Sequence, residues 1–314
     1  MAEEVALRET YGRTLAALGH ENKDIVVLDA DLLSSTMTKY FKAEHSERFF
    51  QVGIAEANMM GIAAGLAAAG KIPFASTFAV FATSRCFDQI RVSIAQAKLN
   101  VKIVATHAGI TVGEDGMSHQ AIEDLALMCS LGGFTVIVPA DSVETEQAVR
   151  AAAALDGPCY IRLGRSKVPV IHDKNYRFGI GKADTIRHGS DLTIIATGIM
   201  VAPALQAAEE LQIEGIDCRV INMSTLKPID EAAIIQAAEE TGAIVTAEEH
   251  MEHGGLGSIV AKVVVQNHPA PMEIVALKQY AESGSPNELL KKYGLTAREI
   301  VAAANIVMKR GSLD

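Results

Sequence analysis

The chain has 314 residues, of which 49% are hydrophobic and 21% are charged, which is enough for two domains of ordinary size. Its net charge of −10 argues against nucleic acid or an anionic membrane surface as the main partner. The four cysteines form no CxxC pair, the first residues lack an apolar signal core, and no uncharged apolar run reaches membrane-spanning length, so we expect a cytoplasmic protein with reduced thiols.

In the first half of the chain, short β-rich runs alternate with longer helical patterns. The predicted strands are Ile25–Leu28, Lys71–Ser76, Val101–Thr106, Phe134–Val138 and Cys159–Leu163. The predicted helices between them are Ala6–Leu18, Ala55–Ala69, Arg85–Ala97 and Thr145–Ala154. Such alternation predicts a mostly parallel sheet with helices on both faces.

The alternation stops over Arg165–Arg187, where proline, glycine and mixed charges replace the periodic pattern. It resumes with predicted strands at Leu192–Ala196, Cys218–Ile221, Ala243–Ala247 and Ile274–Leu277 and predicted helices at Ala202–Gln212 and Glu231–Glu240. We therefore expect an α/β fold of two consecutive open, mostly parallel sheets covered by helices. The predicted division is a first domain over 1–170, a linker over 171–188 and a second domain over 189–314.

Glu56 is the only charged residue between Gly53 and Gly70. It stands at the head of a small, apolar run that favours a helix. An ionised carboxylate in such surroundings needs a partner or takes up a proton, and acids of this kind cluster at functional sites. The alternative is a first-turn glutamate that the helix N-terminus and solvent satisfy.

Polar and aromatic residues follow the predicted strands of the first half. They are Asp29-Ala-Asp31, Gly53-Ile-Ala-Glu56, Ser76-Thr-Phe78, Thr106-His107 and Pro139-Ala-Asp141. Ligands of open α/β sheets bind at the carboxyl ends of strands, where loops enter helices. We therefore expect the site at this edge of the first sheet.

Four separate elements then carry a resemblance to a known family. They are Gly53-Ile-Ala-Glu56, Ser76-Thr-Phe78-Ala-Val-Phe81, Thr106-His107 and Gly113-Glu-Asp115-Gly-Met-Ser-His119-Gln. In this order and spacing they resemble the pyrimidine-binding half of transketolase. The resemblance continues through Leu226-Lys-Pro-Ile-Asp230 and Glu248-Glu-His-Met-Glu-His-Gly-Gly-Leu-Gly257, so that the second domain is similar to the transketolase C-terminal domain.

The resemblance implies the cofactor thiamine diphosphate and a transfer of a two-carbon ketol unit from a ketose phosphate to an aldose phosphate. It makes Glu56 the acid that hydrogen-bonds the pyrimidine ring and so activates the cofactor. Phe78 and Phe81, three residues apart and expected on one face of a helical turn, then contact the pyrimidine. Asp31 is expected near the thiazolium ring.

The resemblance also implies substrate contacts. Arg8, Ser35, His107 and Arg165 fall where transketolases hold the phosphate of a sugar, and guanidinium groups suit phosphate oxygens. Asp115 and His119 correspond to residues that touch the substrate hydroxyls, and His119 is counted with Glu56 among the catalytic residues. Their spacing suits a loop that enters a helix at Gln120; the alternative is that Asp115 only caps this helix.

A full-length transketolase has a preceding domain that holds the diphosphate through a divalent metal, with a Gly-Asp-Gly motif and a later Asn. We find no such element and expect this chain to be the C-terminal subunit of a split transketolase. A separate N-terminal subunit would hold Mg²⁺ or Ca²⁺, this chain would ligate no metal, and two copies of each chain would form an α2β2 assembly. The cluster Glu248–His253 could be misread as a metal site, but its spacing does not fit zinc well.

Three positions depart from the family pattern: Ser84 replaces an aromatic residue, Ala108 a polar residue, and Cys129 begins a turn where relatives carry arginine and proline. They leave the sugar and the pathway open, with pentose phosphates as the default. The rival functions are the β subunit of a 2-oxoacid dehydrogenase, a deoxyxylulose-phosphate-synthase-like enzyme, and a non-catalytic assembly or regulatory subunit.

Overall fold

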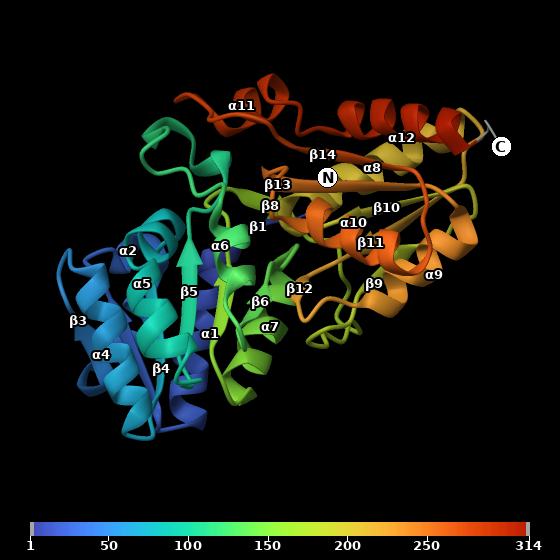
Figure 1. Ribbon diagram of the computed structural model, residues 1–314. Coiled ribbons are helices and arrows are strands. Elements are labelled where there is room, and N and C mark those ends of the chain that lie inside the picture. Colours follow the sequence, from blue (N-terminus) through green and yellow to red (C-terminus); the bar gives the residue numbers. More distant parts are fainter. Residues whose placement is uncertain (1–2, 312–314) are drawn as a thin grey trace.

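The computed structural model describes residues 3–311 and contains two open sheets that lie side by side (Figure 1). The first sheet has the strand order β12-β6-β7-β5-β4-β2-β3, and all its strands are parallel except β12. The strands are β2 (Ile25–Asp29), β3 (Phe49–Gln51), β4 (Ile72–Phe78), β5 (Lys102–Thr106), β6 (Thr135–Ile137), β7 (Cys159–Arg162) and β12 (Thr225–Lys227). Asp29 pairs with Ser76, and Phe78 with Thr106, so the carboxyl ends of three strands meet at one edge.

The second sheet has the order β14-β13-β10-β11-β9, with β9 antiparallel. Its strands are β9 (Asp184–Arg187), β10 (Leu192–Ala196), β11 (Cys218–Asn222), β13 (Ile244–Met251) and β14 (Met272–Leu277). A separate antiparallel pair joins β1 (Glu4–Ala6) to β8 (Lys167–Pro169).

Helices cover both sheets. The α-helices are α1 (Leu7–Glu21), α2 (Leu33–Thr36), α3 (Lys39–Glu44), α4 (Glu56–Ala68), α5 (Phe87–Gln89), α6 (Asp124–Ser130), α7 (Ser142–Ala154), α8 (Val201–Ile213), α9 (Glu231–Thr241), α10 (Leu256–Asn267), α11 (Pro286–Lys292) and α12 (Ala297–Gly311). The 3-10 turns are η1 (Ser46–Arg48), η4 (Ile110–Asp115) and η5 (Gly198–Met200), and the π-helical segments are η2 (Phe81–Arg85) and η3 (Ile90–Ala95). None of the helices within 3–311 is long and apolar enough to cross a lipid bilayer.

Local chemistry explains where helices begin and end. The side chain of Asp230 accepts a hydrogen bond from the Ala233 N–H at 3.2 Å and so caps the start of α9, which typically contributes about 1 kcal/mol. Gly242 ends that helix with a φ of 65°, in the left-handed region that glycine adopts without steric cost. Asp141 caps α7 in the same way as Asp230 caps α9.

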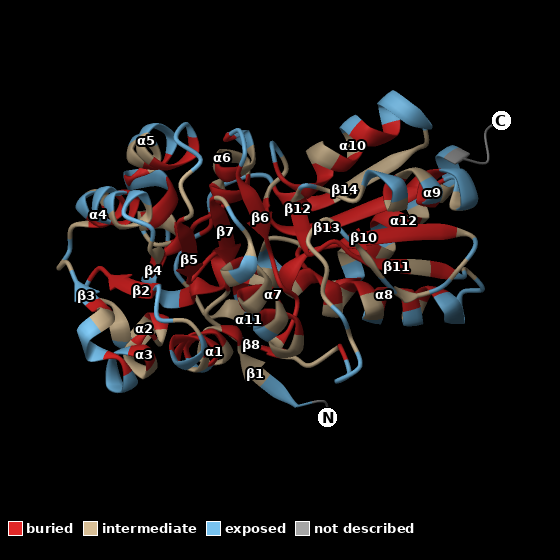
Figure 2. Cartoon of the chain, turned by 90° about the horizontal axis from the view of Figure 1, so that it is seen from below, coloured by how far each residue is buried: buried red, intermediate tan, exposed pale blue. Residues whose placement is uncertain are grey.

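The strands of both sheets are the most deeply buried part of the molecule (Figure 2). One apolar core crosses from the first half to the second: Met59 of α4, Leu226 of β12 and Val260 of α10 belong to the same buried cluster. Each fully buried side chain of this size contributes about 1.5–3 kcal/mol relative to an exposed one. The shared core therefore holds the two halves against each other.

The predicted fold class is confirmed, and each predicted strand and helix overlaps an observed element. Two regions differ from expectation. The segment 171–188, predicted as a linker, contributes β9 to the second sheet, and the predicted helix Arg85–Ala97 is interrupted by π-helical turns. The domain boundaries themselves stay a prediction.

Candidate active site

The carboxyl end of β2 turns sharply to present Asp31. The buried Asp29 carboxylate organises this turn, because it accepts hydrogen bonds from the Leu32 N–H at 2.6 Å and from the Thr36 and Thr38 hydroxyls at 2.7 and 2.9 Å. Burial raises the pKa of Asp29, although these three donors oppose the shift. Asp31 takes a φ of 65° and lies at the edge of a cavity of about 240 Å³.

Glu56 lines the same cavity, from the first residue of α4. Its side chain is only 3% exposed, and Arg85 Nη1 lies 3.1 and 3.0 Å from its two carboxylate oxygens. The Arg85 guanidinium also stands over the Phe81 ring, 4.6 Å from the ring centroid. The carboxylate that the sequence singled out is therefore paired, and its partner Arg85 is a site residue that sequence reasoning missed.

The π-helical segment η2 explains how Arg85 reaches Glu56. A π turn inserts an extra residue into the helical repeat and changes the direction of the side chains that follow, and such turns are frequent at functional sites. Here the segment runs over Phe81–Arg85, so it sets both the ring and the guanidinium of the cavity wall. The hydrophobic periodicity of the sequence did not predict this π-helical turn.

Aromatic and imidazole rings form one wall beside the cavity. Phe78 stacks on His107 with ring centroids 3.9 Å apart, and on Phe81 at 5.8 Å with an interplanar angle of 15°. His119 meets Phe81 edge-on at 5.3 Å. The expectation of a shared helical turn was wrong, because Phe78 ends β4 and only Phe81 is helical; the strand end nevertheless brings the two rings together.

Arg8, Ser35, His107 and Arg165 gather next to this wall. Arg8 Nη1 donates a hydrogen bond to the Ser35 carbonyl at 2.9 Å, and its Nε is buried with no hydrogen-bond partner among the described residues. Burial, with the nearby Arg8 and Arg165 charges, lowers the pKa of His107 to about 3. His107 is therefore neutral at neutral pH, beside two cationic guanidinium groups that suit an anion.

A loop over 109–123 carries Asp115 and His119. Asp115 is exposed and its carboxylate lies 3.6 Å from Arg165 Nη1, whereas the His119 ring faces Phe81. The helix expected at Gln120 begins instead at Asp124, because the Gln120 side-chain amide donates to the Glu282 carbonyl at 3.1 Å and the intervening residues stay irregular. Asp115 therefore caps no helix there.

The cluster Glu248–His253 has structural roles. The Glu248 carboxylate accepts hydrogen bonds from the Leu256 and Gly257 N–H groups, at 2.7 and 2.8 Å, at the start of α10. His250 accepts from the Ala126 N–H and lies 2.7 Å from the Met251 carbonyl, which fixes its neutral Nδ1–H tautomer. Both residues thus support backbone at the junction of the halves.

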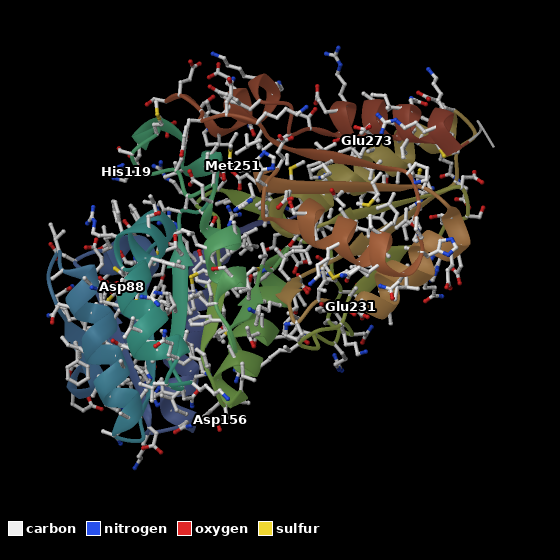
Figure 3. The ribbon with its side chains drawn as sticks, viewed as in Figure 1. Asp88, His119, Asp156, Glu231, Met251 and Glu273 are labelled. Carbon is white, nitrogen blue, oxygen red and sulfur yellow. The ribbon has the colours of Figure 1, made fainter. Side chains whose placement is uncertain are left out.

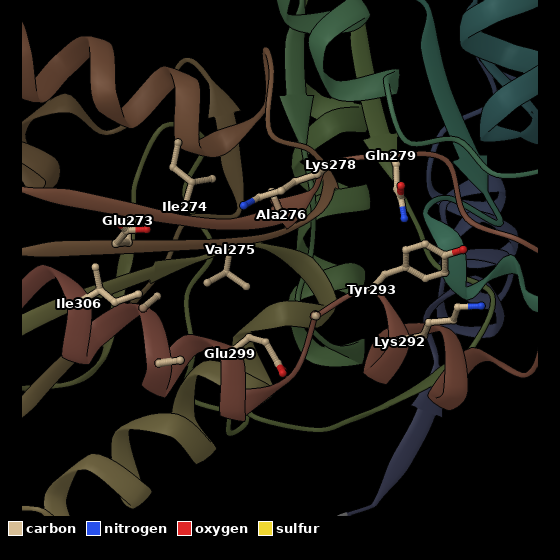
Figure 4. Close-up of a pocket in the computed structure, with 13 residues that line it drawn as sticks. Glu273, Ile274, Val275, Ala276, Lys278, Gln279, Lys292, Tyr293, Glu299 and Ile306 are labelled. Carbon is tan, nitrogen blue, oxygen red and sulfur yellow. The ribbon is translucent and has the colours of Figure 1, made fainter.

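Two other features of the described residues lie apart from these side chains. His20, Glu44 and His45 form a group with metal-ligand character between α1 and α3. A cavity of about 430 Å³ lies between β14 and α12, with Glu273, Lys278 and Tyr293 in its lining (Figure 4). Neither includes a residue that the sequence predicted for the site.

Comparison with known proteins identifies the family. Residues 3–170 match the family model for the transketolase pyrimidine binding domain, and residues 181–300 match that for the transketolase C-terminal domain. A solved structure described as a split gene transketolase, inactive β4 tetramer, superposes with a TM-score of 0.92 at 53% identity, over 97% of this chain and 99% of that chain.

Curated relatives agree with the structural match. The 6-deoxy-6-sulfo-D-fructose transketolase subunit SqwH from Clostridium sp. is 46% identical over 98% of this chain and 96% of its own length. A putative transketolase C-terminal section from Methanocaldococcus jannaschii is 46% identical, with coverages of 97% and 96%. The chain spans only 50% of transketolase-like protein 2 from Mus musculus, to which it is 44% identical. The chain therefore belongs to the transketolase family and corresponds to the C-terminal subunit of a split transketolase.

Proposed function

We propose that this subunit supplies the acid that activates thiamine diphosphate and the side chains that bind a phosphorylated sugar, while a separate N-terminal subunit supplies the diphosphate site. The observation that carries the proposal is Glu56, whose 3% exposed carboxylate faces a cavity beside Phe81. A buried acid next to a flat aromatic face is the arrangement that an aminopyrimidine ring needs.

The residues of the cavity fit the cofactor. Glu56 would hold the pyrimidine ring nitrogen and share a proton with it, Phe78 and Phe81 would supply the apolar wall, and Asp31 would lie toward the thiazolium ring. When bound, thiamine diphosphate supplies the carbon nucleophile for ketol transfer. Arg85, which pairs with Glu56, has a side chain that is 52% exposed and therefore has room to turn toward solvent.

Arg8, Ser35, His107 and Arg165 are proposed to bind the anionic end of the sugar, and Asp115 with His119 its hydroxyls near the reacting carbon. The neutral His107 would donate a hydrogen bond, and the guanidinium groups would supply the positive charge. A sulfonate is a second candidate for this anion site, because it presents three oxygens as a phosphate does and because one relative is named for a sulfo-sugar.

The partner chain remains part of the proposal. We propose that a separate N-terminal subunit holds Mg²⁺ or Ca²⁺ with the diphosphate, and that two copies of each chain form the active assembly. Family resemblance supports this arrangement. Among the described residues that line the cavity, Asp31 is the one acidic residue besides Glu56. Cytoplasmic location and a place in pentose phosphate metabolism also stay predictions.

The substrate class is tested with a panel of donors. The chain is co-expressed with the product of its neighbouring gene, and ketol transfer to an aldose phosphate is measured from xylulose 5-phosphate, free xylulose and 6-deoxy-6-sulfo-D-fructose. Transfer from an anionic donor only would support the proposed anion site, and its choice of anion would decide between phosphate and sulfonate. Equal rates on free and anionic sugars would refute the anion site. Decarboxylation of a 2-oxoacid would instead favour the rival function, the β subunit of a 2-oxoacid dehydrogenase.

A further inference from the structure

A buried ionic cluster lies where the second half of the chain meets the first. Arg162 Nε donates to Asp124 Oδ2 at 2.7 Å, and the Tyr160 hydroxyl donates to the same oxygen at 2.8 Å. Arg162 Nη1 lies 4.0 Å from Oε2 of Glu249, a residue of β13 in the second sheet. The three charged side chains are 6%, 0% and 2% exposed, so this cluster is shielded from solvent.

The cluster holds the loop 109–123 at both of its ends. At the first end, Glu249 Oε1 accepts a hydrogen bond from the Thr111 N–H at 2.7 Å. At the second end, Arg162 Nη2 donates to the carbonyls of Ala121, at 3.1 Å, and of Glu249, at 2.9 Å. Backbone contacts also close the loop, because the Gly109 N–H donates to the Ala121 carbonyl at 2.8 Å and the Met251 N–H donates to the Ile122 carbonyl at 2.9 Å. Within the buried cluster, the Glu249 side chain holds the first end of the loop and the Arg162 side chain the second.

The Glu249 carboxylate packs directly against the backbone of Gly109. Gly109 precedes the Thr111 contact with a φ of +79°, and a Cβ placed on it would lie 2.0 Å from the Glu249 carboxyl carbon. The Glu249 carboxylate therefore occupies the space that a side chain at position 109 would take, which glycine leaves free. Figure 3 shows Met251, at the end of the same strand, on the side of the molecule where the loop presents His119.

The burial of the Glu249 carboxyl group lowers stability, which indicates that this side chain has a function other than stabilising the fold. Glu249 Oε2 accepts no hydrogen bond from any described residue, and burial raises the pKa of Glu249 to about 7 against the opposing Arg162 charge. A buried carboxyl group with an unsatisfied oxygen lowers stability, and in a native protein it calls for an explanation. A purely stabilising contact between the halves would be better made by apolar side chains.

We propose that Glu249 is a positioning residue: by accepting the Thr111 N–H, it holds the loop that presents Asp115 and His119 to the substrate. The second half of the chain then sets the geometry of sugar recognition, although none of its residues up to 311 lines the cofactor cavity. This inference rests on the proposed function for the role of the loop, but the physical link between Glu249 and the loop does not.

The test compares three variants in the complex with the partner subunit. Glu249→Gln keeps an oxygen that accepts the Thr111 N–H, whereas Glu249→Ala removes it and Glu249→Asp draws it back by one methylene. We expect Ala and Asp to raise the KM for the sugar about ten- to a hundredfold, with unchanged affinity for thiamine diphosphate, and Gln to restore near wild-type values. Glu252→Ala, directly after the last residue of the same strand and with its carboxylate near His253, is the matched control and should change neither.

Amide hydrogen exchange separates this inference from the proposed function. Loop residues 110–121 should exchange faster in the Ala and Asp variants than in the wild type and in Gln, whether or not the complex turns over any sugar. If Ala fails to fold, Asp provides the same comparison. Unchanged loop exchange and unchanged KM in Asp would overturn the inference, as would a Gln variant that loses as much as Ala. An inactive wild-type complex with the expected exchange pattern would instead count against the proposed function alone.

Discussion

At the scale of single residues, Glu56 and Arg85 pair in the lining of the cavity, and Arg8 belongs to the anion site that we propose beside it. Arg8 has a buried Nε without a described partner, and its Nη1 is anchored on the Ser35 carbonyl. A charge-assisted hydrogen bond to an anion contributes about 1.5–3 kcal/mol, or roughly ten- to 150-fold in affinity.

Arg8→Ala should therefore raise the KM for a phosphorylated sugar by about ten- to 150-fold, while leaving the KM for the free sugar unchanged. Steady-state kinetics of the reconstituted enzyme measure both values. Arg13→Ala, on the same helix and paired with Glu9 at the surface, serves as the control. A similar rise for the free sugar would mean that Arg8 does not bind the anionic group.

The neutral His107 makes a prediction about pH. Its pKa is about 3 in the folded protein and about 6.5 in the unfolded chain, so the unfolded state binds the additional proton as the pH falls below 6.5. The folding stability that depends on neutral His107 is therefore present above that pH and is lost as the pH falls toward 3. In His107→Gln, acidification from pH 7 to pH 5 should cost about 2 kcal/mol less than in the wild type. Urea unfolding at the two pH values measures the difference, and equal losses would contradict the assignment.

Among single residues, the sequence singled out Glu56 but did not indicate its ion-pair partner Arg85. Glu56 stood out because an isolated carboxylate in an apolar helix is costly, and the structure does bury it. Its ion-pair partner could not be found, because Arg85 lies 29 residues away and reaches it only through a π turn. The roles assigned to the site residues stay predictions.

At the scale of elements, the strand ends and the carboxylate at the start of α10 organise the junction between the halves. Glu248 satisfies two N–H groups that the first turn of a helix otherwise leaves free. The sequence made the cluster Glu248–His253 a poor fit for zinc, but it did not indicate that the Glu248 carboxylate would accept hydrogen bonds from the first turn of α10, eight and nine residues along the chain.

Glu248→Ala should lower the free energy of unfolding by about 1–3 kcal/mol, because two buried donors lose their acceptor. The KM for the sugar should stay within a factor of about two, since the two hydrogen bonds that cap α10 at Glu248 come from Leu256 and Gly257 and not from the loop over 109–123. Chemical denaturation and steady-state kinetics give the two readouts. A variant as stable as the wild type would show that the cap contributes little.

Elements that depend on local periodicity were predictable, and those that depend on distant contacts were not. The buried strands β2, β4, β5 and β10 follow from short apolar runs. The start of α6 at Asp124 does not, because a hydrogen bond from Gln120 to the distant Glu282 carbonyl keeps the preceding residues irregular. β12 has three residues from the second half that join the first sheet, too few for any pattern to indicate their partner.

At the scale of the whole molecule, the two halves share an apolar core and a buried ionic cluster, and the site lies at one edge of the first sheet. A divalent metal and a diphosphate need several oxygen ligands, and we propose that the partner subunit provides them. The isolated chain should then show no ketol transfer with thiamine diphosphate and Mg²⁺, and activity should appear when the partner is added. An assay of the purified chain with and without the partner decides this, and robust turnover by the chain alone would overturn the two-chain account.

The central claim is that Glu56 is the acid that activates the cofactor, and Glu56→Gln tests it most directly in the partner-reconstituted enzyme. Turnover should fall about a hundred- to ten-thousandfold, the range expected for loss of a general acid–base group, while circular dichroism and thermal unfolding stay close to those of the wild type. Glu47→Gln, at an exposed glutamate, should leave turnover unchanged. A Glu56→Gln enzyme with wild-type turnover would contradict the account.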